Sequence, residues 1–469
     1  MSATVATPRP HVLIVGAGLG GLLLGALLER CNIPYTILER ASSVKPLGSA
    51  MVVAGQLMPI IEQLGLFEQV AAVGKRLHSS LMVKENKETM LFMDFLPSEE
   101  LSGYPSYIIS RPLLYDLFLS RVPAHKVLFG KRVLTIAEED DKVRIQTSDK
   151  VVYEGDILVG ADGAYSAVRQ RLYERLKKEG KLPKSDQEDL PFTCTCLVGQ
   201  TVPLDPKEFP QLSDPAHPFV STIGKDKPYT WTLFTTAQNT VCWMTLFHMD
   251  RKSSKAAEEQ RFRNLDNSEW GPHSAQAMAE ETRHFPITFG DGSLTLGDLY
   301  DKTPKELMSK VMLEEKIFKT WYSGRTVLIG DACHKLHPSG GAGALTAMHD
   351  AIALANLIYT LPSNTSEEIE KIFKEYQTER IPPTVERYNG SQMMSKLISK
   401  SLVGVILGHL AKYIPQWFWR DYIKRGLLLR PWAGFLKAVE NKGPLAAFPT
   451  PSTEKARELY NKRTGVQVV

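Results

Sequence analysis

Apolar runs at the start of the chain alternate with a glycine-rich turn and a charged helix end. Residues 11–16, HVLIVG, are almost wholly apolar, as expected for a parallel strand that is covered on both faces. Glycines follow, then an apolar stretch over 22–32 that carries Glu29 and Arg30, then the strand-like YTILER over 35–40. Because glycines and charges interrupt the apolar run, the pattern predicts a buried strand, a turn, a buried helix and a second strand rather than a membrane span.

The rest of the chain changes pattern several times. Residues 132–147 have β-type alternation around a DDK turn. Residues 192–249 are rich in Thr, Val, Phe and Trp, which predicts an antiparallel sheet and marks a second domain. Residues 250–320 favour helix, 325–332 return to a buried strand, and a helical pattern runs from about residue 365 onward.

The composition is that of an ordinary globular protein with two or three domains. The 469 residues are 43% hydrophobic and 23% charged, and a formal net charge of +4 is too small to imply a nucleic-acid partner. The five cysteines include no CxxC pair, which favours reduced thiols over a disulfide framework. The polar start MSATVATPRPH is unlike a secretory signal. We therefore expect a cytoplasmic protein.

The glycine-rich turn has the pattern Gly16-x-Gly18-x-x-Gly21 directly between a strand and a helix. Gly16 permits the tight turn, Gly18 lets the backbone approach a pyrophosphate, and Gly21 lets the helix pack closely, while the helix N-terminus attracts phosphates. Glu39, followed by Arg40, closes the next strand about 20 residues on, where a carboxylate hydrogen-bonds ribose hydroxyls. The turn predicts a dinucleotide site, and both FAD and NAD satisfy it.

The stretch GDACHKLHPSGGAG, which begins at Gly330, precedes a clearly helical run. His334 and His337 are three residues apart, but no other ligands stand at metal spacing nearby, so we predict no metal site. Cys333 stands among small and apolar residues, which favours a role as a small core residue over a role as a nucleophile. What remains is the carboxylate of Asp331 beside a helix N-terminus, which can accept hydrogen bonds from a polyol next to an anion site.

Three motifs in this order resemble the class A flavoprotein monooxygenases, which are single-component, FAD-dependent aromatic hydroxylases and epoxidases. They are the first glycine motif with Glu39, GADGAYSAVR at 160–169, and GRTVLIGDACHKLHPSGGAG at 324–343. The likeness spans roughly residues 10–380, and the chain looks like the fungal enzymes that tailor secondary metabolites. It implies an α/β fold with a Rossmann-like FAD-binding domain, an inserted β-rich substrate domain and a helical C-terminal extension.

The implied domains are discontinuous. The FAD-binding domain takes residues 1–75, 104–190 and 290–380, the substrate-binding sheet takes 76–103 and 191–289, and the helical extension takes 381–469. The pocket is expected from one face of each of two strands, YTWTLFTT and CWMTLFHM, because alternation gives each strand one apolar wall with few polar groups.

The resemblance also implies which residues bind the cofactor, although it names no catalytic side chain. They are Gly16, Gly18, Gly21, Glu39, Arg40, Gly48, Ala50, Arg111, Asp162, Gly330, Asp331, Gly343 and Ala344. Glu39 resembles the acid on the adenosine ribose, and Arg111 resembles the arginine that reaches the pyrophosphate and ribityl region. Gly48 and Ala50 stand in the loop that flanks the flavin.

Two further roles come from the second and third motifs. Asp162 belongs to the DG motif, which the family shares between FAD and pyridine-nucleotide binding, and Asp331 resembles the acceptor of a ribityl hydroxyl. The turn from Gly341 to Ala344 would aim N–H groups at the flavin N1/O2 edge, where negative charge develops on reduction.

This chain departs from the family at that turn. The family often reads Gly-Gln-Gly with an Asn soon after, whereas here Gly341-Ala342-Gly343 precedes Leu345 and Thr346, so the side-chain amides are missing. His349 is expected to be a helix-face residue rather than a catalyst.

The implied activity is oxidative. NADPH or NADH reduces FAD, O₂ adds to form a C4a-hydroperoxyflavin, and the oxygen passes to a small lipophilic aromatic or alkene substrate by hydroxylation or epoxidation. A flavin-dependent halogenase is one alternative, although its W-x-W-x-I-P signature is absent and WFWRDY at 417–422 lacks the Ile-Pro. A flavin redox sensor without turnover is the other.

The C-terminal region mixes helical apolar spacing with basic residues and tryptophans. The helical set is Met394, Ile398, Leu402, Val405, His409 and Tyr413, and the basic and aromatic set is Lys412, Arg420, Lys424, Arg425, Arg430 and Lys437 with Trp417, Trp419 and Trp432. The first set predicts a helix packed on the FAD domain. The second is typical of an interfacial segment, so any membrane contact is expected to be peripheral, on an intracellular membrane.

Overall fold

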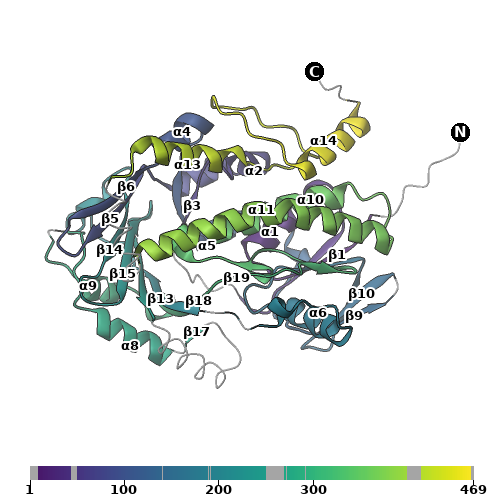
Figure 1. Ribbon diagram of the computed structural model, residues 1–469, viewed down its shortest axis with the longest axis horizontal. Helices are drawn as coiled ribbons and strands as arrows, with labels where there is room; N and C mark the ends of the chain where they lie inside the picture. Colours follow the sequence, from purple (N-terminus) through teal and green to yellow (C-terminus); the bar gives the residue numbers. More distant parts are fainter. Residues whose placement is uncertain are drawn as a thin grey trace, which may run out of the picture.

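The computed structural model describes residues 9–43, 50–139, 141–188, 190, 192–249, 269–270, 272–290, 292–398 and 413–465. A parallel sheet with its helices lies at one end of the molecule and a larger sheet lies at the other (Figure 1). The long helix α11, Ser366–Ile398, runs from the first toward the second.

The parallel sheet has six strands. Their order is β20 (Tyr322–Ser323), β21 (Thr326–Leu328), β12 (Ile157–Gly160), β1 (Val12–Val15), β2 (Tyr35–Leu38) and β8 (Val127–Leu128), and only the β20–β21 pair is antiparallel. All four residues of β1 are buried, with Val12 paired to Tyr35 on one side and Ile157 on the other. The continuous apolar sequence of β1 follows from this central place, because both faces of a central parallel strand are covered.

The larger sheet has eight strands and is mainly antiparallel. Their order is β17 (Glu269–Trp270), β18 (Ser309–Glu314), β13 (Phe192–Gln200), β16 (Val241–His248), β15 (Tyr229–Thr235), β14 (Phe219–Ile223), β5 (Ser79–Lys84) and β6 (Thr89–Asp94). Trp231 and Trp243 point to one face and pack with Phe285 and Tyr300 beneath α8 (Pro272–Thr282) and α9 (Leu296–Asp301). The alternate residues of the same strands point to the other face, which lines a cavity.

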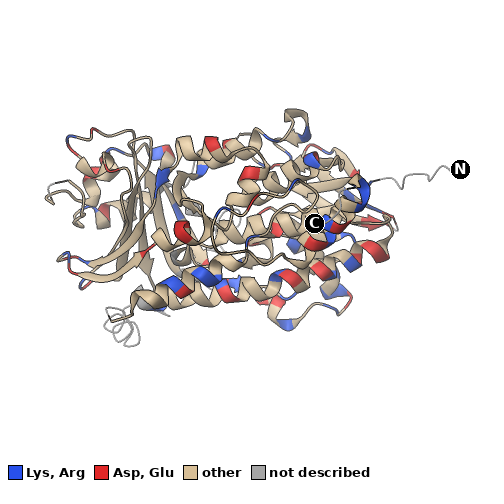
Figure 2. Ribbon diagram, turned by 90° about the horizontal axis from the view of Figure 1, so that it is seen from above, with Lys and Arg blue, Asp and Glu red and all other residues tan. Residues whose placement is uncertain are grey.

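Three small sheets and the remaining helices complete the described fold. The small sheets are β3 (Ala50–Val53) with β7 (Tyr107–Ser110) and β4 (Lys75–Arg76), β11 (Val152–Gly155) with β10 (Lys142–Thr147) and β9 (Val133–Glu139), and β19 (Lys316–Ile317) with β22 (His334–Lys335). The other helices are α1 (Leu19–Arg30), α2 (Met58–Gln63), α3 (Phe67–Val73), α4 (Leu96–Ser102), α5 (Arg111–Leu119), α6 (Ala167–Lys178), α10 (Gly343–Tyr359), α13 (Gln416–Leu428) and α14 (Pro451–Thr464). Acidic and basic residues are interspersed along them (Figure 2).

Two expected limits differ from the structure. Residues 290–380 are assigned to the FAD-binding domain, but β18 within them pairs with β13 in the eight-stranded sheet. The limit at residue 381 falls inside α11, which continues through Pro382 and Pro383. The described part of 250–320 is also less helical than predicted, because Ser309–Glu314 form a central strand that the short apolar run does not distinguish from a helix.

Candidate cofactor and substrate site

A cavity of about 1090 Å³ lies where the carboxyl ends of the parallel strands face the eight-stranded sheet. The segments that follow β1, β12 and β21 all line it, through Gly18, Gly163 and Asp331. In open α/β sheets, ligands bind outside the carboxyl ends of the strands. The cavity therefore joins the edge where a nucleotide cofactor is expected to a wall built by another sheet.

The first glycine motif has the geometry that its three glycines predict. Gly16 has a φ of +105°, and a Cβ on it would lie 2.4 Å from the carbonyl oxygen of Ala161. A Cβ on Gly21 would lie 2.1 Å from the carbonyl oxygen of Gly16, whereas nothing lies within 4 Å of one on Gly18. Gly16 and Gly21 thus permit close backbone packing, and Gly18 leaves the N-terminus of α1 open to the cavity.

Glu39 holds the glycine turn from the next strand. Its carboxylate accepts hydrogen bonds from the N–H groups of Ala17, at 2.8 Å, and Ala41, at 2.9 Å. Each carboxylate oxygen keeps a second lone pair, so a ribose hydroxyl can still donate to it. Arg40 beside it is exposed, and its role toward a cofactor stays a prediction.

Asp331 and Arg111 reach the cavity from different elements. Asp331 follows Gly330 after β21, and Arg111 is the first residue of α5. Neither side chain forms a hydrogen bond or ion pair with another residue in the described part of the chain, so both are available to a ligand. Ala50 also lines the cavity, whereas Gly48 lies outside the described residues.

A second helix N-terminus opens into the same cavity at α10. Gly341 has a φ of +59°, Ala342 is the N-cap residue without a side-chain cap, and Gly343 and Ala344 begin the helix. Nothing lies within 4 Å of a Cβ built on Gly341 or Gly343. Because the first N–H groups of a helix have no partner within it, this turn can stabilise negative charge on a group placed against it.

Asp162 acts locally as a cap on α6. Its Oδ2 accepts from the N–H groups of Ala167, at 2.7 Å, and Val168, at 3.2 Å, while its Oδ1 is buried without a hydrogen-bond partner. Burial raises the pKa of Asp162. The neighbouring Gly163, rather than Asp162, lines the cavity, so the proposed sharing of Asp162 between two cofactors stays a prediction.

Arg169 ties the second motif to the third. Its buried guanidinium donates to the carbonyl oxygens of Ala332, at 2.9 Å, and Ala164, at 2.6 Å, and stacks on Phe318. These bonds fix the loops that carry Gly163 and Asp331 relative to each other.

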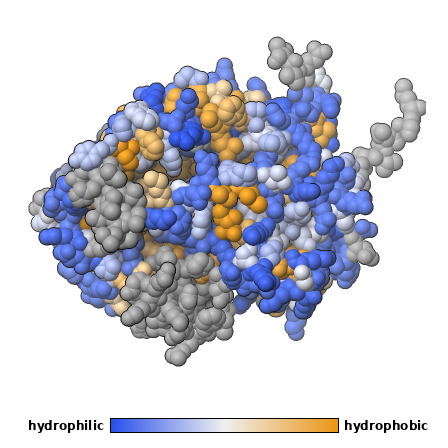
Figure 3. All heavy atoms as spheres, viewed as in Figure 1, coloured by the Kyte–Doolittle hydropathy of each residue, from blue (hydrophilic) through white to orange (hydrophobic). Residues whose placement is uncertain are grey.

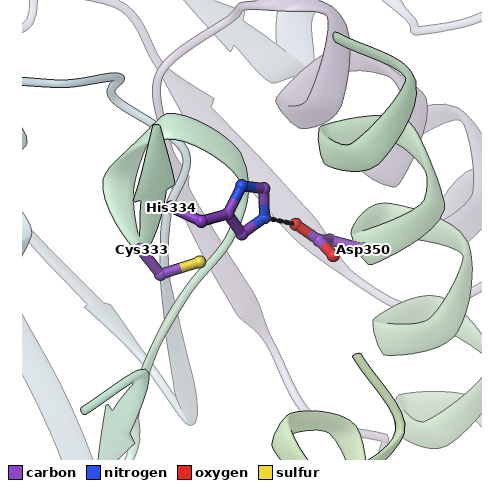
Figure 4. A group of neighbouring side chains, drawn as sticks. All are labelled: Cys333, His334 and Asp350. Atoms are coloured by element: carbon purple, nitrogen blue, oxygen red, sulfur yellow. Dashed lines mark hydrogen bonds and ion pairs between the residues drawn. The ribbon is translucent and has the colours of Figure 1, made fainter. Parts of the chain in front are cut away.

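The cysteine and histidine of the third motif belong to a buried network (Figure 4). Asp350 accepts hydrogen bonds from His334 Nε2 at 2.5 Å, from Arg380 Nε at 2.8 Å and from the Gly330 N–H at 3.0 Å. Cys333 Sγ donates to the carbonyl oxygens of Leu328 and Gly330.

The ligand atoms of Cys333, His334 and Asp350 lie within 4.8 Å of one another, which is compatible with a metal. However, burial raises the pKa of the Cys333 thiol well above its usual value, and a metal needs the thiolate. Asp350 is also already bonded to Arg380. His337 points elsewhere, with Nε2 3.8 Å from Glu315 Oε1. We therefore interpret this cluster as a structural support for the Gly330–Asp331 turn.

The far wall of the cavity comes from the predicted strand faces. Thr230, Thr232 and Phe234 of β15 line it together with Met244 and Leu246 of β16. This confirms the expected single face of each strand. Because Thr230 and Thr232 are part of it, this wall is less apolar than the sequence of the two strands predicts.

Part of the cavity wall comes from the C-terminal helices, which the sequence does not predict. Arg387 and Met394 of α11 line the cavity, as do Phe418 and Tyr422 of α13. Of these residues, Met394 belongs to the set that predicts a helix packed on the FAD domain. A face that contacts another element looks the same in sequence whether that contact is solid core or a cavity wall, so no local signal marked these residues.

Comparison with known proteins agrees with this geometry. A family model described as "FAD binding domain" matches residues 9–288 and 298–386. The FAD-dependent monooxygenase atmM of Aspergillus flavus is 27% identical over 454 residues, covering 93% of this chain and 88% of its own length. The FAD-dependent monooxygenase paxM of Penicillium paxilli is 28% identical over 420 residues, with coverages of 86% and 81%.

Two solved structures share the fold. Klebsiella pneumoniae HpxO, complexed with FAD and uric acid, matches with a TM-score of 0.70 and 18% identity, covering 90% of this chain and 97% of its own. The 2,6-dihydroxypyridine-3-hydroxylase of Arthrobacter nicotinovorans matches with a TM-score of 0.64 and 15% identity, with coverages of 84% and 93%. The predicted α/β fold, the family resemblance and the FAD cofactor are therefore confirmed.

Proposed function

We propose that this chain, which belongs to the FAD binding domain family, uses NAD(P)H and O₂ to hydroxylate or epoxidise a lipophilic aromatic or alkene substrate. It is an FAD-dependent monooxygenase of the kind found in fungal secondary metabolism. The observation that supports the proposed reaction and substrate class is a cavity bounded by two open helix N-termini on one side and by the eight-stranded sheet on the other.

The residues that line the cavity, together with Glu39, which is hydrogen-bonded to the glycine turn but does not line the cavity, fit FAD at the edge of the parallel sheet. Gly18 and the N-terminus of α1 would hold the pyrophosphate, Glu39 the adenosine ribose, and Asp331 the ribityl chain. The start of α10 would face the flavin ring. When bound, FAD supplies the redox chemistry, because NAD(P)H reduces it and O₂ then reacts at its C4a atom.

The protein itself supplies position and shielding. Phe234, Met244 and Leu246 form an apolar wall that favours a lipophilic substrate and disfavours water near the reacting atoms. The hydroxyl groups of Thr230 and Thr232 already hydrogen-bond His248 and Ser221. A hydroxyl group can form more than one hydrogen bond, so they can still orient one polar function of that substrate.

The test is product analysis with the FAD-loaded protein. Aromatic and prenylated compounds are supplied with NADPH or NADH under ¹⁸O₂, and we expect one ¹⁸O atom in the product and faster nicotinamide oxidation with a true substrate. Chloride-dependent products would instead identify a halogenase. Nicotinamide oxidation that no compound stimulates, with no labelled product, would favour a redox sensor.

Replacing Arg111 with alanine is expected to weaken FAD binding, or to slow its reduction, by about tenfold or more, because a charged donor is lost from the cavity. The matched control is Arg121→Ala near the other end of the same helix. Arg121 Nη2 donates to the carbonyl oxygen of Gly65 at 3.0 Å, so its loss should affect stability more than the cofactor. Flavin content and stopped-flow reduction rates measure both, and equal effects would contradict the role of Arg111.

Among the described residues, the candidates for the proposed peripheral membrane contact are fewer than the sequence suggests: they are the exposed residues at and just before the start of α13. Trp419 and Arg430 are buried, and Arg420 and Arg425 pair with Glu100 and Asp421. Leu402, Val405, His409 and Lys412 lie outside the described residues. Trp417 and Tyr413 are exposed by 69% and 79%.

On the face drawn in Figure 3, hydrophobic patches are separated by hydrophilic ones. Across the described part of the chain, every helix is too short or too polar to cross a bilayer.

We expect the protein to float with anionic vesicles at low salt and Trp417→Ala to float several-fold less. Tryptophan at the interface contributes apolar area, and neighbouring cations such as Lys424 add a salt-sensitive attraction. A point variant is preferable to truncation, because α14 packs on α10. Leu134→Ala, an exposed apolar residue of β9, is the control. Absence of binding by the unmodified protein would end the membrane proposal.

A further inference from the structure

Arg387 brings a positive charge to the cavity from α11. Its Nη1 donates to Thr346 Oγ1 at 3.3 Å and its Nη2 contacts His349 Nδ1 at 3.1 Å. The other ring nitrogen of His349, Nε2, lies 3.2 Å from the carbonyl oxygen of Gln56, within hydrogen-bond distance. Burial lowers the pKa of His349 well below its usual value, so the ring is neutral and accepts from Arg387 at Nδ1.

The charge of Arg387 is only partly compensated by the protein. Two of the five N–H donors of a guanidinium are used, both on uncharged acceptors, and Arg387 forms no ion pair with a carboxylate in the described part of the chain. Burial, followed by the charge of Arg380, lowers the pKa of Arg387 to about 9, although the charges of Asp350 and Glu386 act in the opposite direction, so Arg387 stays protonated at neutral pH. Keeping a partly buried charge with unused hydrogen-bond donors is costly unless a ligand brings negative charge to it.

The position of this charge is defined by α10. Thr346 lies in the first turn of that helix, which begins at Gly343 and opens into the cavity. Gln56, on the other side of His349, also lines the cavity. Arg387 therefore stands beside the helix N-terminus that faces the flavin ring in the proposed function. At this same turn the sequence has Ala342, and then Leu345 and Thr346, where the family often has side-chain amides.

We propose that Arg387, together with the N-terminus of α10, stabilises the negative charge that FAD acquires at its N1/O2 edge on reduction. The step is FAD + NAD(P)H → FADH⁻ + NAD(P)⁺, in which a hydride carries two electrons and one proton and leaves one negative charge on the flavin. The inference rests on the proposed binding of FAD in this cavity. It assigns to a residue of the C-terminal helical region the task of setting the reduction potential.

The test is the midpoint potential of bound FAD, measured by spectroelectrochemistry on the flavin-loaded fraction. Arg387→Met is expected to favour oxidised over reduced FAD by about 10- to 100-fold, which is a fall of about 30–60 mV for a two-electron couple. Arg387→Lys keeps the charge and should recover much of the loss. Sulfite, which adds to oxidised flavin and also places negative charge on the ring, should bind Arg387→Met more weakly than the unmodified protein.

The control is Arg420→Met on α13, whose guanidinium is exposed and paired with Glu100, so the potential should not move. A potential and sulfite affinity unchanged in Arg387→Met would overturn the inference while leaving the monooxygenase proposal intact. Failure of the unmodified protein to hold a reducible flavin would overturn both. A fall in potential that Arg387→Lys does not recover at all would show that packing, rather than charge, is responsible, and would also overturn it.

Discussion

Purified protein with Asp331 replaced by alanine is expected to bind FAD about 10- to 150-fold more weakly than the unmodified chain. The carboxylate lines the cavity and makes no hydrogen bond within the described part of the protein, so in the proposed complex its acceptors serve the ribityl hydroxyls. Loss of a hydrogen bond to a charged group costs about 1.5–3 kcal/mol, which corresponds to that range of affinity. Flavin content after dialysis and titration of the apoprotein with FAD measure the effect.

Two variants separate this effect from a general loss of structure. Asp331→Asn keeps one acceptor oxygen and should bind FAD with intermediate affinity. Asp226→Ala removes an exposed carboxylate from the loop between β14 and β15 and should leave flavin content unchanged. Full occupancy of Asp331→Ala after extensive dialysis would remove Asp331 from the cofactor site.

The glycine motif and the parallel sheet could be predicted from the sequence because their determinants are local. Gly16 must adopt a positive φ, and Gly21 must approach the backbone of Gly16, so neither position tolerates a larger residue. The four buried residues of β1 need no partner pattern to identify them, because a central parallel strand is apolar on both faces.

The C-terminal side of the site depends on contacts that are distant in sequence. Arg387 contacts His349 across 38 positions, and His349 contacts Gln56 across 293. The helical pattern of α11 indicates which residues share a face, but it does not indicate that this face meets the start of α10. For the same reason the sequence predicts an ordinary helix-face residue at His349, whereas in the structure His349 contacts Arg387 at the cavity.

β18 illustrates a different limit. Its six residues carry the pattern Ser-Lys-Val-Met-Leu-Glu, which is too short to favour strand over helix. Pairing with β13 decides its conformation, and that pairing joins residues more than 100 positions apart. The same pairing places part of the segment assigned to the FAD-binding domain in the larger sheet.

Asp350 offers the largest expected effect on stability. It is fully buried and accepts from His334, Arg380 and the Gly330 N–H. Asp350→Ala leaves the Arg380 charge without its partner in the core, and breaking such a buried pair costs about 3–5 kcal/mol. Urea denaturation of the unmodified and variant proteins should show this loss of unfolding free energy, whereas Asp116→Ala, on the exposed face of α5, should change it by less than about 0.5 kcal/mol.

The same network predicts the response of the fold to acid. Burial alone would raise the pKa of Asp350, but the charges of His334 and Arg380 outweigh burial and lower it. A carboxyl group whose pKa is lower in the folded than in the unfolded state stabilises the fold above its ordinary pKa, and this contribution is lost as the pH falls through the lowered value. The unfolding free energy of the unmodified protein should therefore fall below about pH 4, where the unfolded aspartate begins to bind a proton. Asp350→Ala should lack this component, so the gap between the two proteins should narrow as the pH decreases, and a gap that stays constant down to pH 2 would mean that packing rather than charge makes Asp350 important.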